Sequence, residues 1–209
     1  MTGPTAALST RERLIFAAIQ LFWEKGYANT SMNDLLTAAK ANSGSFYHFF
    51  PSKENLLLAV LDTYFTMLYP QMLAPAWEGI DDPIERIFAL LARYRMLVLQ
   101  TECTYGCPIG RLALEISSEQ EEVHRLLAKN FDGWTAAVRG CLEQAADRFP
   151  PDTDHERLSE FVLVVMEGGV MLSRSHRSVK PFDQAVAELR AYFNRLQESA
   201  KTIRKGKGD

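Results

Sequence analysis

The sequence predicts an all-α fold, in which three short N-terminal helices precede a larger helical domain. Apolar residues recur at spacings of three and four along most of the chain, as in a helix with one buried face. Several of these segments follow a hydroxyl or acidic residue that has another acidic residue three positions later, a pattern that marks helix starts. The Asn-Gly pair typical of a β-hairpin does not occur in the sequence.

The first helix is expected between a capping box and a glycine. The Ser9 hydroxyl can accept the amide of Glu12, and the Glu12 side chain can reach back to the amide of Ser9. Lys25-Gly26 ends this helix, because glycine readily adopts the left-handed conformation just past a C-terminus. The residues expected on its buried face are Leu14, Ala18, Leu21 and Phe22.

Two further short helices are expected before residue 55. Ser31 and Asp34 open the second helix, residues 40–42 form a tight connection, and the third helix begins at Ser43. Two short helices joined by three or four residues form a helix-turn-helix, the motif whose second helix reads DNA. The plainer alternative is an αα-hairpin, whose second helix needs no particular surface.

The segment 43–54 carries the side chains expected of a helix that contacts DNA. Small hydroxyl residues come first, aromatic residues follow, and a proline, a helix cap and Lys53 come last. Hydroxyls, an imidazole and an ammonium can then share one surface while the rings anchor it from behind. Phosphate contacts would position such a helix, and small side chains would contact base edges.

Residues 11–57 resemble the N-terminal DNA-binding domain of the TetR family of bacterial transcriptional regulators. So many matches in register over one short segment are specific. The matching residues are Leu14, Ala17, Ala18, Leu21, Phe22, Gly26, Tyr27, Thr30, Ser31, Asp34, Leu35, Ala38, Ala39, Gly44, Phe46, Tyr47, Phe49, Phe50, Ser52, Lys53, Glu54 and Leu56.

The resemblance implies a set of contacts to an operator in double-stranded DNA. Hydroxyls at the start of the second helix would touch phosphate, the third helix would face the major groove, and Lys53 would take a further phosphate beside exposed amides. The rings of Phe46, Phe49 and Phe50 would pack the small core. The DNA-facing set is Thr30, Ser31, Asn42, Ser43, Gly44, Ser45, Tyr47, His48 and Lys53.

Two positions in the turn depart from the family pattern. Lys40 stands where the family commonly has glycine, and a residue other than glycine tolerates a positive φ but adopts it uncommonly. Ala41 replaces the usual branched residue and packs less. Neither change removes a DNA-facing group, so the predicted fold stands. The changes affect the angle at which the helix-turn-helix docks on DNA.

The charge of the chain excludes a nonspecific nucleic-acid coat. Residues 1–55 hold five basic side chains against four acidic ones, and the whole chain has a formal net charge of −3. Nonspecific binding requires a strongly basic surface. Binding is therefore expected to rest on a few well-placed contacts, repeated by the two-fold symmetry of a homodimer.

The chain has 209 residues, 47% of them hydrophobic, and can bury a sizeable core. A DNA-binding domain is expected at residues 9–55, and an effector-binding and dimerisation domain at residues 56–200. The basic segment 201–209 is expected to be a frayed tail. A loop is expected at 74–79. Helix starts are expected at Ser52, at Asp82-Pro83, near Ser117 or Ser118, at Thr153 with Glu156, and at Lys180-Pro181.

The resemblance implies a homodimer in which the last two helices of each chain form a four-helix bundle. Gly168-Gly169 lowers helix stability by about 1 kcal/mol per glycine relative to alanine. A close approach at the dimer crossing, or room for a ligand, is expected to offset this loss, and a tolerated kink is the alternative. The residues assigned to the interface are Phe161, Val165, Gly168, Gly169, Leu172, Val186, Leu189 and Phe193.

The motif from Gly106 to Glu115, Gly-Cys-x-x-Gly-x-Leu-Ala-x-Glu, resembles a subgroup of the family whose effectors include reactive electrophiles and small unsaturated acids. Pro108 suits the first position of a helix, which places Cys107 at the N-cap, where amides favour a thiolate and Arg111 could help. Cys107 is then a candidate sensor of electrophiles or oxidation, and an inert buried cysteine is the alternative. A disulfide or zinc site with Cys103 is weaker, because the cysteine count is odd and no second Cys/His pair lies nearby.

The effector pocket can be outlined only from aromatic, apolar and polar candidates, for each of which core packing is the default. These candidates are Tyr94, Cys107, Phe131, Trp134, Met166 and Glu167, with His124 as a further polar residue that is expected to be exposed.

The sequence therefore predicts a ligand-responsive regulator of transcription, most simply a repressor that a small-molecule effector releases from its operator. It calls for no metal or other cofactor. The alternatives are a redox or small-molecule sensor with little DNA role, or a cysteine-dependent enzyme, against which no His or Asp stands beside the cysteines in sequence. The N-terminus shows no secretory leader, and the longest apolar runs fall short of the ~20 residues of a membrane span, so a cytoplasmic protein without membrane association is expected.

Overall fold

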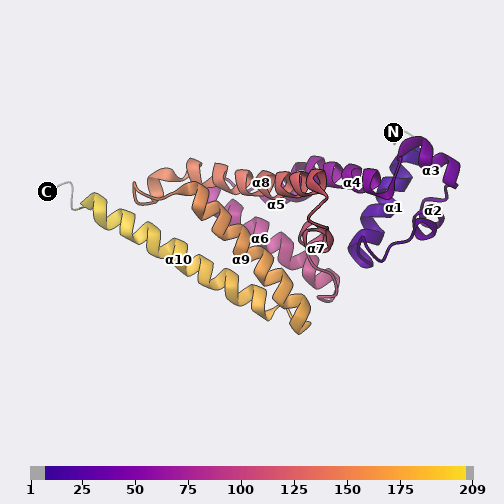
Figure 1. Cartoon of the computed structure of the whole chain (residues 1–209). Coiled ribbons are helices and arrows are strands. Elements are labelled where there is room, and N and C mark those ends of the chain that lie inside the picture. Colours follow the sequence, from indigo (N-terminus) through magenta and orange to yellow (C-terminus); the bar gives the residue numbers. More distant parts are fainter. Residues whose placement is uncertain (1–7, 206–209) are drawn as a thin grey trace, which may run out of the picture. The chain divides into compact units, whose positions relative to one another are not determined.

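Every regular element in residues 8–205, which the computed structural model describes, is a helix (Figure 1). The predicted all-α fold is confirmed. In chain order the elements are α1 (Thr10–Glu24), α2 (Met32–Ala39), α3 (Ser43–Phe49), α4 (Lys53–Met67), the π-helical turn η1 (Leu68–Leu73), α5 (Ala74–Trp77), α6 (Pro83–Gln100), α7 (Pro108–Glu115), α8 (Glu121–Gln144), the 3-10 turn η2 (Ala146–Arg148), α9 (His155–His176) and α10 (Lys180–Lys205).

The chain divides into two compact units that are not continuous in sequence. The N-terminal unit runs to Phe65 and also contains residues 108–128, and the C-terminal unit contains residues 66–107 and everything from Lys129 onward. This division differs from the expected boundary near residue 55, because residues 108–128, which include α7, group with the first helices. Residues 201–205 belong to α10 instead of a frayed tail, and residues 206–209 lie outside the described residues.

The predicted caps of the first two helices and of α6 are present. The side chains of Ser9 and Ser31 form reciprocal capping boxes with Glu12 and Asp34, and Asp82 caps α6 ahead of a proline. Three expectations were wrong. The loop expected at 74–79 is helical as far as Trp77, the long helix α8 begins at Glu121, and Asp154 rather than Thr153 accepts the Arg157 amide at the start of α9.

The core of the N-terminal unit is formed by α1, α2, α3 and the first half of α4. Lys40 ends α2 in the left-handed conformation, with φ 49° and ψ 49°, as its place in the turn predicts. Phe46 and Phe50 are buried as expected, whereas Phe49 is 38% exposed and does not join the core. The largest fully buried side chains of these four helices are Leu14, Phe22, Leu35, Phe46, Leu56, Leu57 and Leu61.

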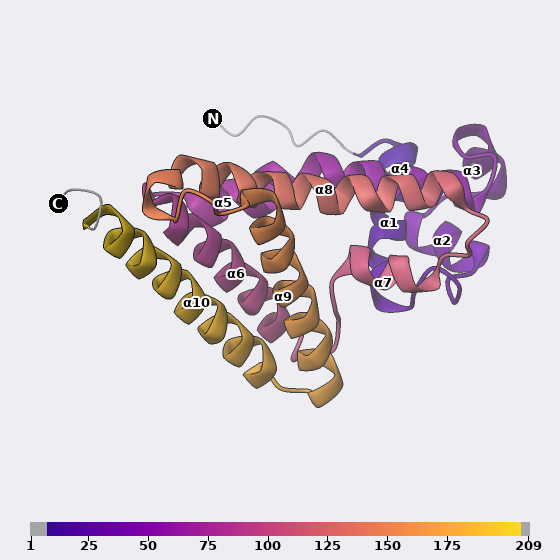
Figure 2. The same ribbon diagram turned by 60° about the vertical axis from the view of Figure 1, so that its left-hand side comes forward.

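The C-terminal unit is built around α6, α8, α9 and α10, with α9 and α10 side by side in both views (Figures 1 and 2). Its centre is aromatic. The ring of Phe193 meets those of Phe88 and Phe149 edge-on, at centroid distances of 5.3 and 5.8 Å. Because aromatic pairs favour this geometry, the three rings fix how α10 lies against α6 and η2.

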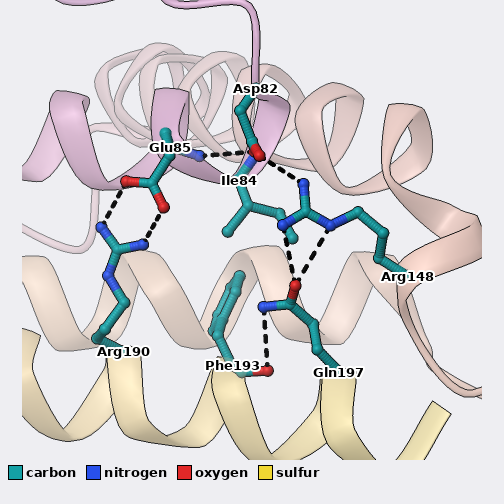
Figure 3. A network of polar contacts seen from close by, with 7 residues as sticks. All are labelled: Asp82, Ile84, Glu85, Arg148, Arg190, Phe193 and Gln197. Carbon is teal, nitrogen blue, oxygen red and sulfur yellow. Dashed lines mark hydrogen bonds and ion pairs between the residues drawn. The ribbon is translucent and has the colours of Figure 1, made fainter. Parts of the chain in front are cut away.

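A polar network ties the start of α6 to η2 and α10 (Figure 3). Asp82 caps Ile84 and Glu85 and accepts Arg148 Nη1 at 2.7 Å, while the other two Arg148 nitrogens donate to Gln197 at 3.2 and 2.9 Å. Burial acts to raise the pKa of Asp82, but the Arg148 guanidinium and the two cap amides outweigh it and hold that pKa below its usual value.

A second ion pair lies beside this network. The Arg190 guanidinium donates to both carboxylate oxygens of Glu85 and stacks 3.4 Å from the centroid of the Phe88 ring (Figure 3 shows the ion pair). Such planar stacking combined with a two-pronged pair is specific to arginine. The two arginines therefore hold α10 and η2 to the first turn of α6.

One helical stretch corrects the expectation about membrane spans. The continuous segment Lys53–Trp77 is long and apolar enough to cross a membrane by length and composition, with 28% of its most apolar window buried. A single such stretch is weak support for a span, because the core helix of a soluble protein meets the same criteria. Here its buried residues Leu56, Leu57, Val60 and Leu61 belong to the core of the N-terminal unit.

The two adjacent glycines of α9 are expected to respond oppositely to alanine. A Cβ on Gly169 would lie 2.9 Å from Phe182 Cδ2 and 3.3 Å from Phe182 Cα, whereas a Cβ on Gly168 meets nothing within 4 Å. Gly169→Ala is expected to destabilise by about 1 kcal/mol, because overpacking outweighs the gain in helix propensity. Gly168→Ala is expected to stabilise by up to about 1 kcal/mol. Urea unfolding of both variants checks this, and midpoints that move in the same direction would contradict it.

Candidate functional site

The start of α3 presents small polar residues on an exposed surface. Asn42 is the N-cap, and its side-chain oxygen accepts the Ser45 amide at 2.8 Å, so this oxygen organises the helix start. Ser43 and Gly44 are exposed and Ser45 is half-buried. Asn42 therefore keeps its amide group at the surface while its oxygen caps the helix.

Tyr47 and His48 are both exposed on α3 and are supported from behind by aromatic rings. Tyr47 is 59% exposed and meets Phe46 edge-on at 5.2 Å. The His48 ring meets Phe49 at 4.8 Å in the same manner. Because their neighbours restrict these rings without covering them, both side chains are available to a duplex groove or backbone.

The two hydroxyl residues before α2 differ in what they can contact. Thr30 is 1% exposed, and its hydroxyl donates to Gly26 O at 2.6 Å, so it cannot reach a phosphate as expected from the family pattern. Ser31 is exposed at the N-cap. Its hydroxyl and amide hold the pKa of Asp34 well below its usual range, with the Lys25 ammonium 3.0 Å away adding to this effect.

Lys53 lies in the first turn of α4 but is turned toward the protein. Its ammonium donates to Tyr27 O at 2.5 Å and stands 4.3 Å from the centroid of the Tyr27 ring. Burial lowers the pKa of Lys53, while the Glu115 carboxylate acts in the opposite direction. A phosphate contact by Lys53 stays a prediction. It requires the ammonium to bind the Tyr27 carbonyl and a DNA phosphate at the same time.

Four of the six residues expected at the effector site lie together in the C-terminal unit. The rings of Tyr94 and Trp134 meet edge-on at 6.3 Å, and the Cys107 thiol hydrogen-bonds to the Glu167 carboxylate. Burial raises the pKa of the Tyr94 phenol, and the charges of Cys107 and Glu167 add to this effect. Met166 precedes Glu167 and is buried in the same core. We call Tyr94, Cys107, Trp134 and Glu167 the polar cluster.

Trp134 Nε1 and Glu167 Oε1 are buried without a well-formed hydrogen bond among residues 8–205, although the Trp134 indole lies close enough to the Tyr94 hydroxyl to oppose the rise in its pKa. One is a donor and the other an acceptor. Burial raises the pKa of Glu167, and the hydrogen bond from Cys107 opposes that effect. Buried polar atoms usually have partners, so these two atoms mark the cluster as a place where a ligand can bind.

Two other candidates are not brought to the polar cluster. Phe131 is half-buried on α8 and lies outside the buried core of its unit. His124 is exposed as expected, and its Nε2 lies 3.1 Å from Ser117 O within the N-terminal unit. Sequence reasoning missed Ser173, whose buried hydroxyl also has no partner in the described part of the chain, because a serine in a helix carries no signal of burial.

The three cysteines differ in accessibility. Cys103 and Cys141 are buried, and Cys107 is half-buried directly before Pro108, the first residue of α7, as predicted. Burial raises the pKa of the Cys141 thiol, which makes it less reactive. Residues 8–205 contain no group of three or more His, Cys, Asp or Glu placed to hold a metal ion.

The candidate dimer surface on α9 and α10 divides into exposed and buried positions. Phe161 and Leu172 are 45% exposed, and Val165, Gly168 and Val186 are half-buried. In contrast Gly169, Leu189 and Phe193 are buried inside the chain, so their assignment to the interface was wrong. Sequence reasoning missed four exposed apolar side chains on the same two helices, Val164, Met171, Tyr192 and Ile203.

A helix-turn-helix with an exposed second helix, followed by a helical domain with a buried polar cluster, defines the class of helical DNA-binding regulators. The model of the bacterial regulatory proteins of the tetR family matches residues 14–60. The model of the tetracyclin repressor-like C-terminal domain matches residues 83–189. The chain therefore belongs to the TetR family of DNA-binding transcriptional regulators and is not an enzyme.

Full-length relatives agree with this assignment. An uncharacterized HTH-type transcriptional regulator of Mycobacterium tuberculosis is 32% identical over 195 residues, which cover 91% of this chain and 94% of that protein. The HTH-type transcriptional repressor DhaR of Mycobacterium sp. strain GP1 is 26% identical over 200 residues, 95% and 98% of the two chains. The crystal structure of a TetR transcriptional regulator from Chloroflexus aurantiacus superposes with a TM-score of 0.75 at 27% identity, covering 88% and 94%.

Proposed function

We propose that this regulator is a repressor that binds a palindromic operator as a homodimer and leaves it when a small molecule binds. The observation that carries the proposal is the exposed face of α3, where Ser43, Tyr47 and His48 stand on a helix held rigidly by Phe46. DhaR, which is similar over nearly the whole chain, is named a repressor. As a DNA-binding regulator, the protein would act in the cytoplasm.

The homodimer is supported by the apolar side chains that α9 and α10 leave exposed. Phe161 and Tyr192 form an edge-on ring pair with a centroid distance of 6.0 Å, and both rings are more than a third exposed. The same surface carries Val164, Met171 and Leu172. A contiguous apolar surface of this kind marks a protein contact, and two-fold pairing places two α3 helices on one face of a duplex.

The polar cluster is our candidate for the effector site. Its surroundings are apolar, and its two buried atoms without a well-formed hydrogen bond offer one donor and one acceptor. The ligand that fits is a small, mostly apolar molecule with a polar group that accepts from the Trp134 indole and donates to Glu167. The half-buried Cys107 within this cluster extends the proposal to electrophilic ligands, in line with the subgroup that the Gly106–Glu115 motif resembles. A redox-sensing role of Cys107 is the alternative.

Tyr47→Ala is expected to weaken operator binding without unfolding the protein. The ring is 59% exposed, and losing one groove or phosphate contact of this kind costs about 1–3 kcal/mol, or roughly five- to 150-fold in affinity, at each half-site. Fluorescence anisotropy with duplexes from the DNA flanking the gene measures this loss. Tyr69→Ala, at a tyrosine 64% exposed outside the DNA-binding helices, is the matched control and should bind as the wild type does.

The same titrations, repeated over a range of salt concentrations, test the proposal as a whole. A specific dimer should prefer one palindromic duplex over scrambled DNA of equal length and should lose affinity steeply with added salt. If the wild-type protein shows no preference for a palindrome at moderate salt, the proposed function is wrong.

A further inference from the structure

The C-terminal end of α1 presents backbone carbonyls that another helix contacts. The carbonyls of Leu21 and Phe22 accept the amides of Lys25 and Gly26, at 2.8 and 3.0 Å. The carbonyls of Trp23 and Glu24 come next, and no basic residue stands in the last turn of α1 to meet them. Carbonyls at a helix C-terminus favour a cation, and a basic side chain from elsewhere in the chain can supply it.

That cation is Arg111 of α7, 88 residues away in sequence from Trp23. Its Nη1 donates to Trp23 O at 3.0 Å and to Glu24 O at 3.3 Å, while its Nε donates to Glu115 Oε1 at 2.9 Å. The side chains of Arg111 and Glu115 are only 17% and 20% exposed. The expectation that Arg111 assists Cys107 is therefore replaced by a contact with the helix-turn-helix domain.

Glu115 completes the contact from the other side. Its second carboxylate oxygen accepts the amide of Ala28 at 3.1 Å, in the short segment between α1 and α2. Gly26, at φ 92°, leaves the space for this approach, because a Cβ there would collide with both Arg111 and Glu115. Glu115 thus joins the end of α1, the approach to α2 and Arg111 in one hydrogen-bonded group.

The contact also reaches the start of α4. Glu115 acts electrostatically on Lys53, whose ammonium bonds to Tyr27 O, and Gln120 donates to Glu54 at 2.7 Å. Residues 108–120 are therefore bonded to three parts of the helix-turn-helix domain. Lys53 is one of the predicted phosphate contacts, and the Glu115 carboxylate favours its charged form.

We propose that Arg111 and Glu115 are positioning residues for DNA binding, forming a clamp that fastens α7 to the C-terminal end of α1 and to the segment between α1 and α2. The clamp includes the backbone of Trp23, Glu24 and Ala28. Cys107 is bonded to Pro108, the first residue of α7, so a change at Cys107 reaches the clamp through one short helix. This last step rests on the proposed effector role of Cys107, whereas the positioning role does not.

The positioning role is tested with Arg111→Met and Glu115→Gln. Glu115→Gln keeps the size of the side chain, so it remains a test if Arg111→Met folds poorly. Both are expected to weaken operator binding by roughly tenfold, the worth of a lost charge-assisted hydrogen bond. Both should also speed hydrogen exchange of the Ala28 amide while leaving exchange in α8–α10 unchanged. Arg111→Lys, which keeps the charge, should restore part of the affinity.

Arg125→Met is the matched control, because Arg125 also pairs with a glutamate, Glu122, in the same unit but is 62% exposed. It should change neither operator affinity nor exchange at Ala28. The positioning role is overturned if Arg111→Met and Glu115→Gln bind the operator and protect Ala28 as the wild type does. A loss of thermal stability without these two changes would show a purely structural role and would also overturn it.

Transmission from Cys107 is tested by alkylation with iodoacetamide, followed by mass spectrometry to locate the adduct. Alkylation should lower the operator affinity of the wild type but not lower it further in Arg111→Met, and Cys107→Ser should not respond. An unmodified Cys107, or an alkylated wild type that binds the operator normally, would overturn the effector role of Cys107. The positioning role is judged separately, by affinity and by exchange at Ala28.

Discussion

Phe46→Ala is expected to unfold the N-terminal unit and abolish operator binding while the C-terminal unit stays folded. The Phe46 ring is fully buried, edge-on to Tyr47 and 5.9 Å from the Phe50 ring. Removing a buried phenylalanine costs about 3–5 kcal/mol, a large part of the 5–15 kcal/mol that stabilises a typical domain. Because the core of this unit is small, little surrounding structure can fill the cavity.

Hydrogen exchange followed by mass spectrometry measures this effect separately in each unit. Peptides from α1–α3 should lose protection in Phe46→Ala, and peptides from α9 and α10 should keep it. Tyr47→Ala is the control, since it removes the neighbouring ring from the surface and should lower operator affinity with protection intact. Protection of α1–α3 equal to that of the wild type would show that Phe46 does not hold this unit together.

The parts of the fold that sequence reasoning predicted well are those set by neighbours in the chain. The capping boxes at Ser9 and Ser31 and the proline start after Asp82 each depend on residues within three positions. Lys40 adopts the left-handed conformation at the turn position where the family commonly has glycine. Local physical chemistry decides such features, so an isolated stretch of sequence is enough to find them.

Features that depend on distant residues were not predicted, and Thr30 shows why. Its hydroxyl matches the family pattern of a phosphate contact, but the return of the chain after α1 buries it against the Gly26 carbonyl. Arg111 is the clearer example, because its partners lie 87 and 88 positions away and the motif around Cys107 suggested a different role. A periodic pattern identifies a buried face but not the element that covers it.

The near-neutral charge of the N-terminal domain fits the geometry of its basic residues. Arg13 donates to Ala39 O at 3.0 Å, Lys25 pairs with Asp34, and Lys53 bonds to Tyr27 O. These cations are largely engaged in holding helices together, so they add less to attraction of phosphate than their number suggests. Specific contacts from α3, doubled in a homodimer, then have to supply most of the operator affinity.

Phe193→Ala is expected to destabilise the C-terminal unit by about 3–5 kcal/mol at every protein concentration. Phe193 was assigned to the dimer interface from its place on the last helix, yet it is fully buried between Phe88 and Phe149 of the same chain. A core residue lowers the stability of each chain, whereas an interface residue weakens association and makes the loss depend on concentration.

Phe161→Ala is the matched variant, because Phe161 is 45% exposed and packs edge-on with Tyr192 on the proposed dimer surface. It should raise the dimer dissociation constant in sedimentation equilibrium while lowering the urea midpoint only slightly at high concentration. Phe193→Ala should lower that midpoint strongly at both low and high concentration. If Phe193→Ala dissociates into folded monomers, Phe193 belongs to the dimer interface. The loss of a core residue would instead destabilise each chain.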